Sequence, residues 1–108
     1  LKFNKQDRCY IFNVIPAFEI SKKPTEIPGD ITGIYKCFNK NKNVLYIGKG
    51  NIKSRIKEHL GKEWEIAKVD YSVIKDNEEM LKYESYHLEQ FKKDNGAYPP
   101  HNLIGGKR

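Results

Sequence analysis

Two short segments of β-forming residues, separated by a polar turn, constrain the fold of this chain more than any other feature. The segments are residues 33–38 (GIYKCF) and residues 44–48 (VLYIG), and the residues between them read NKNKN. Apolar runs that flank a polar stretch of hairpin length predict two antiparallel strands. The first run begins Gly33-Ile34-Tyr35 and the second ends Tyr46-Ile47-Gly48, so the two are nearly mirror images.

The two tyrosines of this hairpin set its expected register. If Tyr35 pairs with Tyr46, both phenols project from one face, Gly33 lies opposite Gly48, and residues 39–42 form the loop. Cross-strand aromatic packing is a common reason for such a pair. The flanking glycines point instead to a bulge or to a close approach of another backbone, because glycine is poor in strands.

The rest of the chain alternates between further strand and helix patterns. Helical spacing extends over residues 52–60 and stops at Gly61, and a second helix runs from a cap at Asn77 to about residue 93, before Asn95-Gly96. The remaining predicted segments are a strand or packed arm at 10–18, a loop at 21–30 and a strand at 69–75. This order predicts an α+β domain, a small antiparallel sheet flanked by helices, at residues 33–108. Residues 1–32 form an N-terminal arm and loop with no assigned role.

Composition narrows the class of protein. The length of 108 residues suits one domain. The formal net charge of +6 favours binding to a polyanion; the alternative is that the lysines only keep the surface solvated. No stretch approaches the roughly 18 apolar residues of a membrane span, and no secretory signal is visible at the start. The two cysteines are too few for a disulfide scaffold, so we expect a reducing, cytoplasmic setting. The first residue is Leu1 and not Met, so we expect an excised domain or a trimmed product.

Polar residues accompany the apolar stripe of the first predicted helix. Ile52, Ile56 and Leu60 recur at every fourth position and should face the core. Arg55 and His59 lie on the flank of this stripe. They are therefore candidates for a site at the edge of the core.

An acidic residue interrupts the apolar face of the second predicted helix. Leu81, Leu88 and Phe91 line one face, and Glu84 falls among them. A carboxylate that faces a core costs several kcal/mol unless it is paired or binds a metal. Two interpretations remain open: an Arg55–Glu84 ion pair at a helix–helix contact, or a cleft in which Glu84 faces a cation and Arg55 a phosphate.

These residues together resemble a known family. Gly33-Ile34-Tyr35, ten residues and then Tyr46-Ile47-Gly48 are similar to the paired tripeptides of the GIY-YIG nuclease superfamily. The resemblance covers residue 33 to about residue 105, roughly two-thirds of the chain. The further matching positions, in chain order, are Arg55, His59, Glu84 and, after Pro99-Pro100, Asn102.

The resemblance implies a GIY-YIG endonuclease-like fold and a divalent-metal-dependent DNA endonuclease that hydrolyses phosphodiester bonds. Glu84 would hold Mg²⁺, with Mn²⁺ as a substitute, and is preferred to Glu89 because Glu89 lies off the apolar face. Arg55 would clamp the scissile phosphate. The candidate DNA-binding residues are Lys36, Lys49 and Lys53.

The resemblance also assigns the remaining catalytic roles. Tyr35 would act on the attacking water as base or hydrogen-bond partner, and Tyr46 would orient the water or the phosphate. An unperturbed phenol has a pKa of about 10, so Tyr35 needs positive charge nearby to work as a base. His59 would assist proton transfer or bind phosphate, and Asn102 would brace the site through hydrogen bonds.

Several alternatives stay open at this point. The chain is expected to bind DNA, without a membrane, as a monomer or a DNA-induced dimer. Its setting would be phage-type, homing or restriction-like. The alternatives are a catalytically silent basic DNA-binding module, a repair-type incision domain of a larger protein, and a scaffold in which Arg55–Glu84 is only structural.

Overall fold

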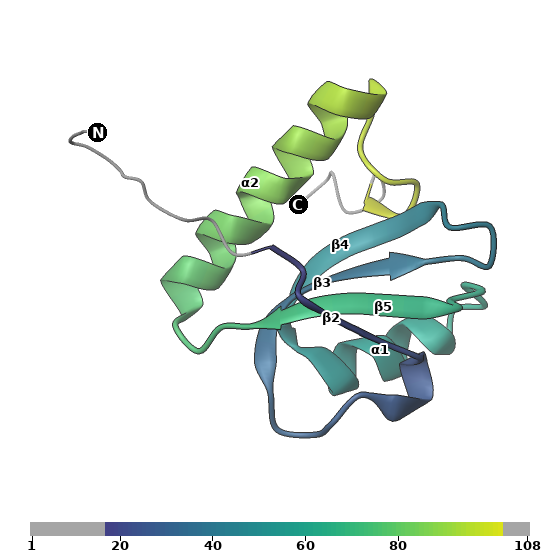
Figure 1. Ribbon diagram of the computed structural model, residues 1–108, viewed down its shortest axis with the longest axis vertical. Coiled ribbons are helices and arrows are strands. Elements are labelled where there is room, and N and C mark those ends of the chain that lie inside the picture. The colour runs from purple at the N-terminus through teal and green to yellow at the C-terminus, as the bar shows by residue number, and fades with distance from the viewer. Residues whose placement is uncertain (1–16, 103–108) are drawn as a thin grey trace.

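An antiparallel sheet carries the other elements of the protein. In the computed structural model, which describes residues 17–102, its strands are β2 (Ile20–Lys22), β3 (Thr32–Phe38), β4 (Val44–Asn51) and β5 (Lys68–Val73). They lie in the order β2-β5-β3-β4, so β3 is central and β4 lies at one edge (Figure 1). The predicted small antiparallel sheet is thereby confirmed. The predicted segment at 10–18 lies almost wholly outside the described residues.

The edge strand β2 was not predicted: its last two residues fall in the segment 21–30 that was expected to be a loop, and Ile20 falls in no predicted element. Residues 20–22 pair with β5, and the short helix η1 (Pro24–Glu26) follows. All three residues of β2 are exposed, so the strand carries no alternation of apolar and polar residues that would reveal it.

Two α-helices complete the domain, and a side chain caps the start of each. α1 (Ile52–Leu60) begins after Asn51, whose side chain accepts a hydrogen bond from the Ser54 N–H at 3.0 Å. α2 (Asn77–Asn95) begins after Asp76, which accepts one from the Glu79 N–H at 2.9 Å. The prediction of Asn77 as the cap is therefore wrong by one residue. Asp76 adds a negative charge at the positive end of the helix dipole.

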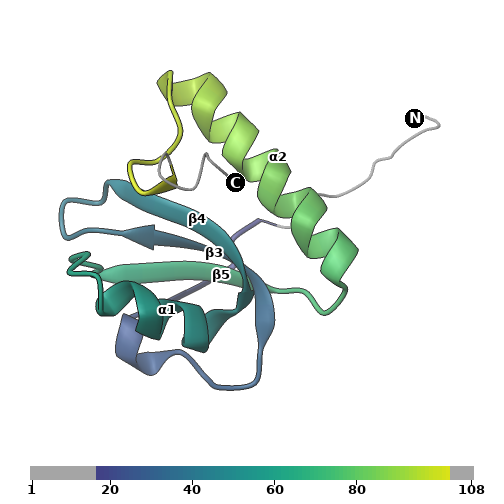
Figure 2. The same ribbon diagram turned by 180° about the vertical axis from the view of Figure 1, so that it is seen from behind.

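The helices cover opposite faces of the sheet (Figures 1 and 2). Ile52 and Ile56 of α1 pack in one buried cluster with Tyr35, whereas Met80 of α2 packs in another with Ile34. Because successive strand residues point to opposite faces, Ile34 and Tyr35 pack on opposite sides of the sheet. The predicted third member of the α1 stripe, Leu60, is 41% exposed.

The hairpin of β3 and β4 has a different register from the predicted one. Tyr35 lies opposite Gly48, and Tyr46 lies opposite Cys37. The register differs by two residues, and a shift of two preserves the face, so the two phenols still share one side of the sheet. The loop spans residues 39–43, one residue more than predicted, with an irregularity between Cys37 and Phe38.

Gly33 occupies a position where the neighbouring strand leaves no space for a side chain. A Cβ atom on Gly33 would lie 1.8 Å from the backbone oxygen of Ser72 in β5. The close approach of a second backbone, which the sequence offered as one reason for a strand glycine, is therefore present.

The chain after α2 returns to the outer edge of β4. The His101 N–H donates to the Leu45 carbonyl at 3.1 Å. The buried Asn102 side chain accepts from the Ile47 N–H at 2.8 Å and donates to the Ile47 carbonyl at 3.0 Å. These bonds pair backbone groups that an edge strand would otherwise leave open.

Candidate active site

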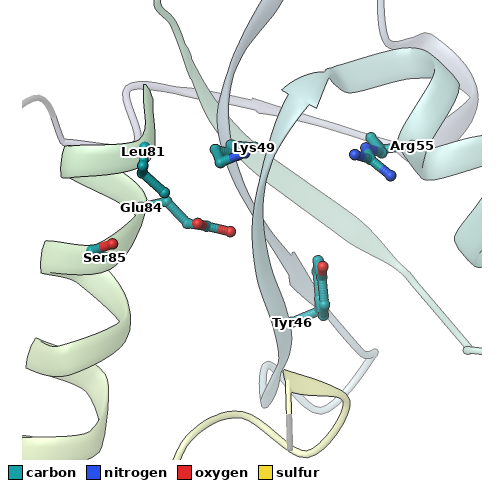
Figure 3. A pocket seen from close by; sticks show the side chains of 6 residues that line it. All are labelled: Tyr46, Lys49, Arg55, Leu81, Glu84 and Ser85. Carbon is teal, nitrogen blue, oxygen red and sulfur yellow. The ribbon is translucent and has the colours of Figure 1, made fainter. Parts of the chain in front are cut away.

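A hollow of about 470 Å³ lies where β4, α1 and α2 meet. Figure 3 shows its side chains, which come from all three elements. The lining residues are Tyr46, Lys49, Arg55, Leu81, Glu84 and Ser85. Because β4 is an edge strand, groups from the two faces of the sheet can meet beside it.

Arg55 and Lys49 give this hollow two positive charges. Arg55 is half-exposed and makes an ion pair with Glu58, one turn along α1, at 3.6 Å. This bond lies within one helix, so it is not the predicted structural pair with Glu84. Gly50 has a φ of 120°, and a Cβ there would lie 3.2 Å from the Arg55 Nε atom. Glycine at this position near the end of β4 therefore leaves room for the guanidinium and adopts a backbone conformation that other residues avoid.

Glu84 reaches the hollow from a buried stripe of α2. The buried residues of that helix are Met80, Glu84 and Leu88, spaced four apart. The predicted stripe of Leu81, Leu88 and Phe91 is thus wrong in Leu81, which is 54% exposed, whereas Leu88 is buried and Phe91 half-buried. Glu84 itself is 5% exposed, and its carboxylate points from α2 toward β4 (Figure 3).

The two phenols of the hairpin have different environments. Tyr46 lines the hollow, whereas Tyr35 is 1% exposed and is not among the lining residues. The Tyr35 hydroxyl forms a hydrogen bond with His59 Nε2 at 2.8 Å. Burial first, and the neighbouring Tyr46 second, raise the pKa of Tyr35 well above its ordinary value. A Cβ on Gly48 would lie 2.5 Å from the Tyr46 ring and 2.6 Å from the Tyr35 hydroxyl, so this glycine makes room for both rings.

His59 is a buried, neutral member of an aromatic stack. Its ring stacks on Trp64 at 4.3 Å, and the other side of Trp64 stacks on His101 at 4.0 Å. Burial, followed by the charge of Lys62, lowers the pKa of His59 to about 4. His59 is 5% exposed, so at neutral pH it presents neither a charge nor an open surface to a phosphate.

The predicted lysines lie in three different places. Lys49 lines the main hollow, and Lys53 lines a smaller one of about 290 Å³ near the start of α1, together with Lys57. Lys36 projects from the α2 face of the sheet, with its ammonium 4.8 Å from the centre of the Phe18 ring. Burial lowers the pKa of Lys36. Lys36 is therefore separated from Tyr35, whose side chain points to the opposite face.

The residues present fit a hydrated magnesium ion better than a metal enclosed by protein. Within residues 17–102, no group of three or more His, Cys, Asp or Glu side chains is placed to hold a metal. Mg²⁺ commonly retains several waters and takes one or two carboxylates together with substrate phosphates. Glu84, in a water-accessible hollow with space for a phosphate, is a donor of that kind.

Sequence reasoning missed two parts of this region. Leu81 and Ser85 belong to the hollow, but the apolar spacing predicts Leu81 in the core and gives no sign of Ser85. The stacking of Trp64 between His59 and His101 was also missed, because it joins segments that no local pattern connects. The spacing of Leu81, Glu84 and Ser85, all within about one helical turn, was the available signal for a shared surface.

Comparisons with known proteins do not assign this chain to a family. No protein-family model and no curated protein matches it. Among the described helices, none is long and apolar enough to cross a membrane.

Proposed function

We propose that the protein is a divalent-metal-dependent DNA endonuclease that hydrolyses phosphodiester bonds at the hollow beside β4. One observation carries the proposal: Arg55, Lys49, Tyr46 and Glu84 come from three elements and line one solvent-accessible space. Two cations and one carboxylate suit a site that takes an anionic substrate and a cation together. The net charge of +6 favours a polyanionic substrate such as DNA.

The side chains that line the hollow would have different roles in hydrolysis. The Arg55 guanidinium suits two oxygens of one phosphate, and the Lys49 ammonium adds positive charge beside it. Glu84 would hold Mg²⁺, which when bound supplies charge neutralisation at the phosphoryl group. Tyr46 is placed to donate a hydrogen bond to a phosphate oxygen or to an attacking water, since its side chain lines the same space.

The environment of Tyr35 favours a positioning role. Its raised pKa keeps the phenol protonated at neutral pH, and its hydrogen bond goes to His59. We propose that Tyr35 and His59 hold Tyr46 in place, because both rings lie close to Tyr46, with centroid distances of 6.0 and 4.7 Å.

Nicking of supercoiled plasmid in Mg²⁺ tests the proposal. Glu84→Gln keeps the side-chain volume and removes the charge, so we expect a loss of about 100-fold or more in the nicking rate. Glu89→Gln is the matched control, because Glu89 is exposed on the same helix and does not line the hollow. Tyr46→Phe should slow nicking more than Tyr35→Phe does. Equal rates for the parent and Glu84→Gln would reject the assigned site.

A catalytically silent DNA-binding module is the second candidate, and the burial of Tyr35 favours it. The resemblance assigns the activation of water to Tyr35, and if Tyr46, which lines the hollow instead, cannot replace it, the cations would bind phosphate without cleavage. This candidate predicts salt-dependent DNA binding with no nicking in either Mg²⁺ or Mn²⁺.

A further inference from the structure

An exposed apolar side chain lies beside the charged groups of the hollow. Leu81 is 54% exposed, more than any other large hydrophobic residue in the part of the chain described. It lines the hollow next to Glu84, and Ser85 follows one turn along α2 from Leu81 (Figure 3). Neither packing of α2 nor chemistry at a phosphate accounts for a leucine at this position.

The walls of the hollow differ in the ligand groups that they suit. Tyr46 and Arg55 line the α1 side of the hollow, whereas Lys49 lies opposite Ile34 and projects from β4 on the α2 side; all three donate hydrogen bonds or positive charge to phosphate oxygens. The wall formed by α2 carries a carboxylate, a hydroxyl and an isobutyl group. A hydrated cation has no favourable contact with Leu81, because its shell consists of oxygen ligands. An apolar surface on the ligand is what would cover this leucine.

The volume of the hollow leaves space for such a group. About 470 Å³ corresponds to roughly fifteen water molecules at about 30 Å³ each. A magnesium ion with about six oxygen ligands occupies well under half of this space, even when the phosphate oxygen is counted among them. The remaining volume is large enough for the sugar, and part of the base, attached to that phosphate.

We infer that Leu81 and Ser85 form a nucleoside-contact surface for the nucleotide next to the scissile phosphate. The inference rests on the proposed function for the identity of the ligand. Leu81 packs against the apolar side of the deoxyribose or base, and the Ser85 hydroxyl donates to or accepts from its polar edge. These residues therefore determine how the site distinguishes a nucleotide from a bare phosphate chain.

Two probes separate this contact from simple attraction to phosphate. Binding of a fluorescein-labelled DNA duplex is measured by anisotropy in Ca²⁺, and inorganic polyphosphate is measured as its competitor. Leu81→Ala should weaken DNA binding about 5- to 10-fold and leave polyphosphate binding unchanged, because only DNA has an apolar surface to bury. Ser85→Ala should weaken DNA binding about 3-fold.

Tyr86→Ala is the matched control, since Tyr86 is 45% exposed on α2 and is not part of the lining. It should change neither affinity. Unchanged DNA binding in Leu81→Ala, or an equal loss for both probes, would overturn the inference. A DNA-selective loss in a protein that never nicks plasmid would support the contact and reject the nuclease proposal. If the protein nicks plasmid and Leu81→Ala changes neither nicking nor DNA binding, the nucleoside contact is rejected and the nuclease proposal stands.

Discussion

Burial of His59 makes the stability of the protein dependent on pH. Its pKa is lowered to about 4 in the folded state, from an ordinary value of 6.5. In the unfolded chain His59 takes up a proton below about pH 6.5, whereas the folded protein resists protonation until about pH 4. The contribution to stability is therefore complete above pH 6.5 and is lost as the pH falls from 6.5 through 4. A pKa change of one unit corresponds to about 1.4 kcal/mol, so the free energy of unfolding falls by about 3 kcal/mol at pH 4.

His59→Gln isolates this contribution from other titrating groups. A glutamine amide can replace the ring Nε2 atom as the partner of the Tyr35 hydroxyl, but it does not titrate. The free energy of unfolding is measured by urea titration at several pH values between 4 and 8. Circular dichroism is the suitable probe, because Trp64 fluorescence would itself respond to the two stacked imidazoles.

We expect the parent to lose about 3 kcal/mol more than His59→Gln between pH 7 and pH 4. A constant offset between the two proteins carries no information, since the substitution also alters the stack on Trp64. Parallel pH profiles would refute the reasoning, because they would mean that His59 is protonated equally easily in the folded and unfolded states.

Two further substitutions test contacts that position the site. Gly33→Ala should lower the free energy of unfolding by about 2–4 kcal/mol, because its Cβ meets the Ser72 backbone oxygen. Gly29→Ala, whose Cβ would make only an ordinary contact at 3.9 Å, should change it by less than about 0.5 kcal/mol in urea titrations of both variants. Asn102→Ala should cost about 2–4 kcal/mol, because it leaves both backbone groups of Ile47 without their partner. An unchanged melting temperature in Asn102→Ala would show that the tail does not hold β4.

Most helices and strands could be predicted from the sequence, because the patterns that mark them lie within a few residues of each element. The polar turn, the periodicity of α1 and the glycines after each helix act within a few residues, and each corresponds to an observed boundary. The face of α2 was predicted incorrectly for a different reason. The apolar residues alone place Leu81 in the core, yet the observed buried stripe centres on Glu84. A buried carboxylate in the middle of the stripe is therefore what the apolar periodicity does not predict.

The environments of Tyr35 and Tyr46 depended on strand order, which the sequence did not provide. Both phenols were expected at one site because they share a face, and they do share it. However, β3 is central and β4 is at the edge, so the phenol on the central strand is enclosed and the phenol on the edge strand meets the hollow. A local pattern cannot distinguish these positions, because they depend on where β5 pairs.

The strand glycines that carry the resemblance already have structural reasons to be present. Gly33 accommodates the backbone of Ser72, and Gly48 accommodates the rings of two tyrosines. A protein with this sheet would need these glycines even if it had no catalytic activity. Arg55 is different, because half of its side chain is exposed and its ion pair with Glu58 is a surface contact of little energetic value. The case for a nuclease therefore depends on Arg55 and the other groups that line the hollow. Substitutions that alter these groups without unfolding the sheet are the decisive ones.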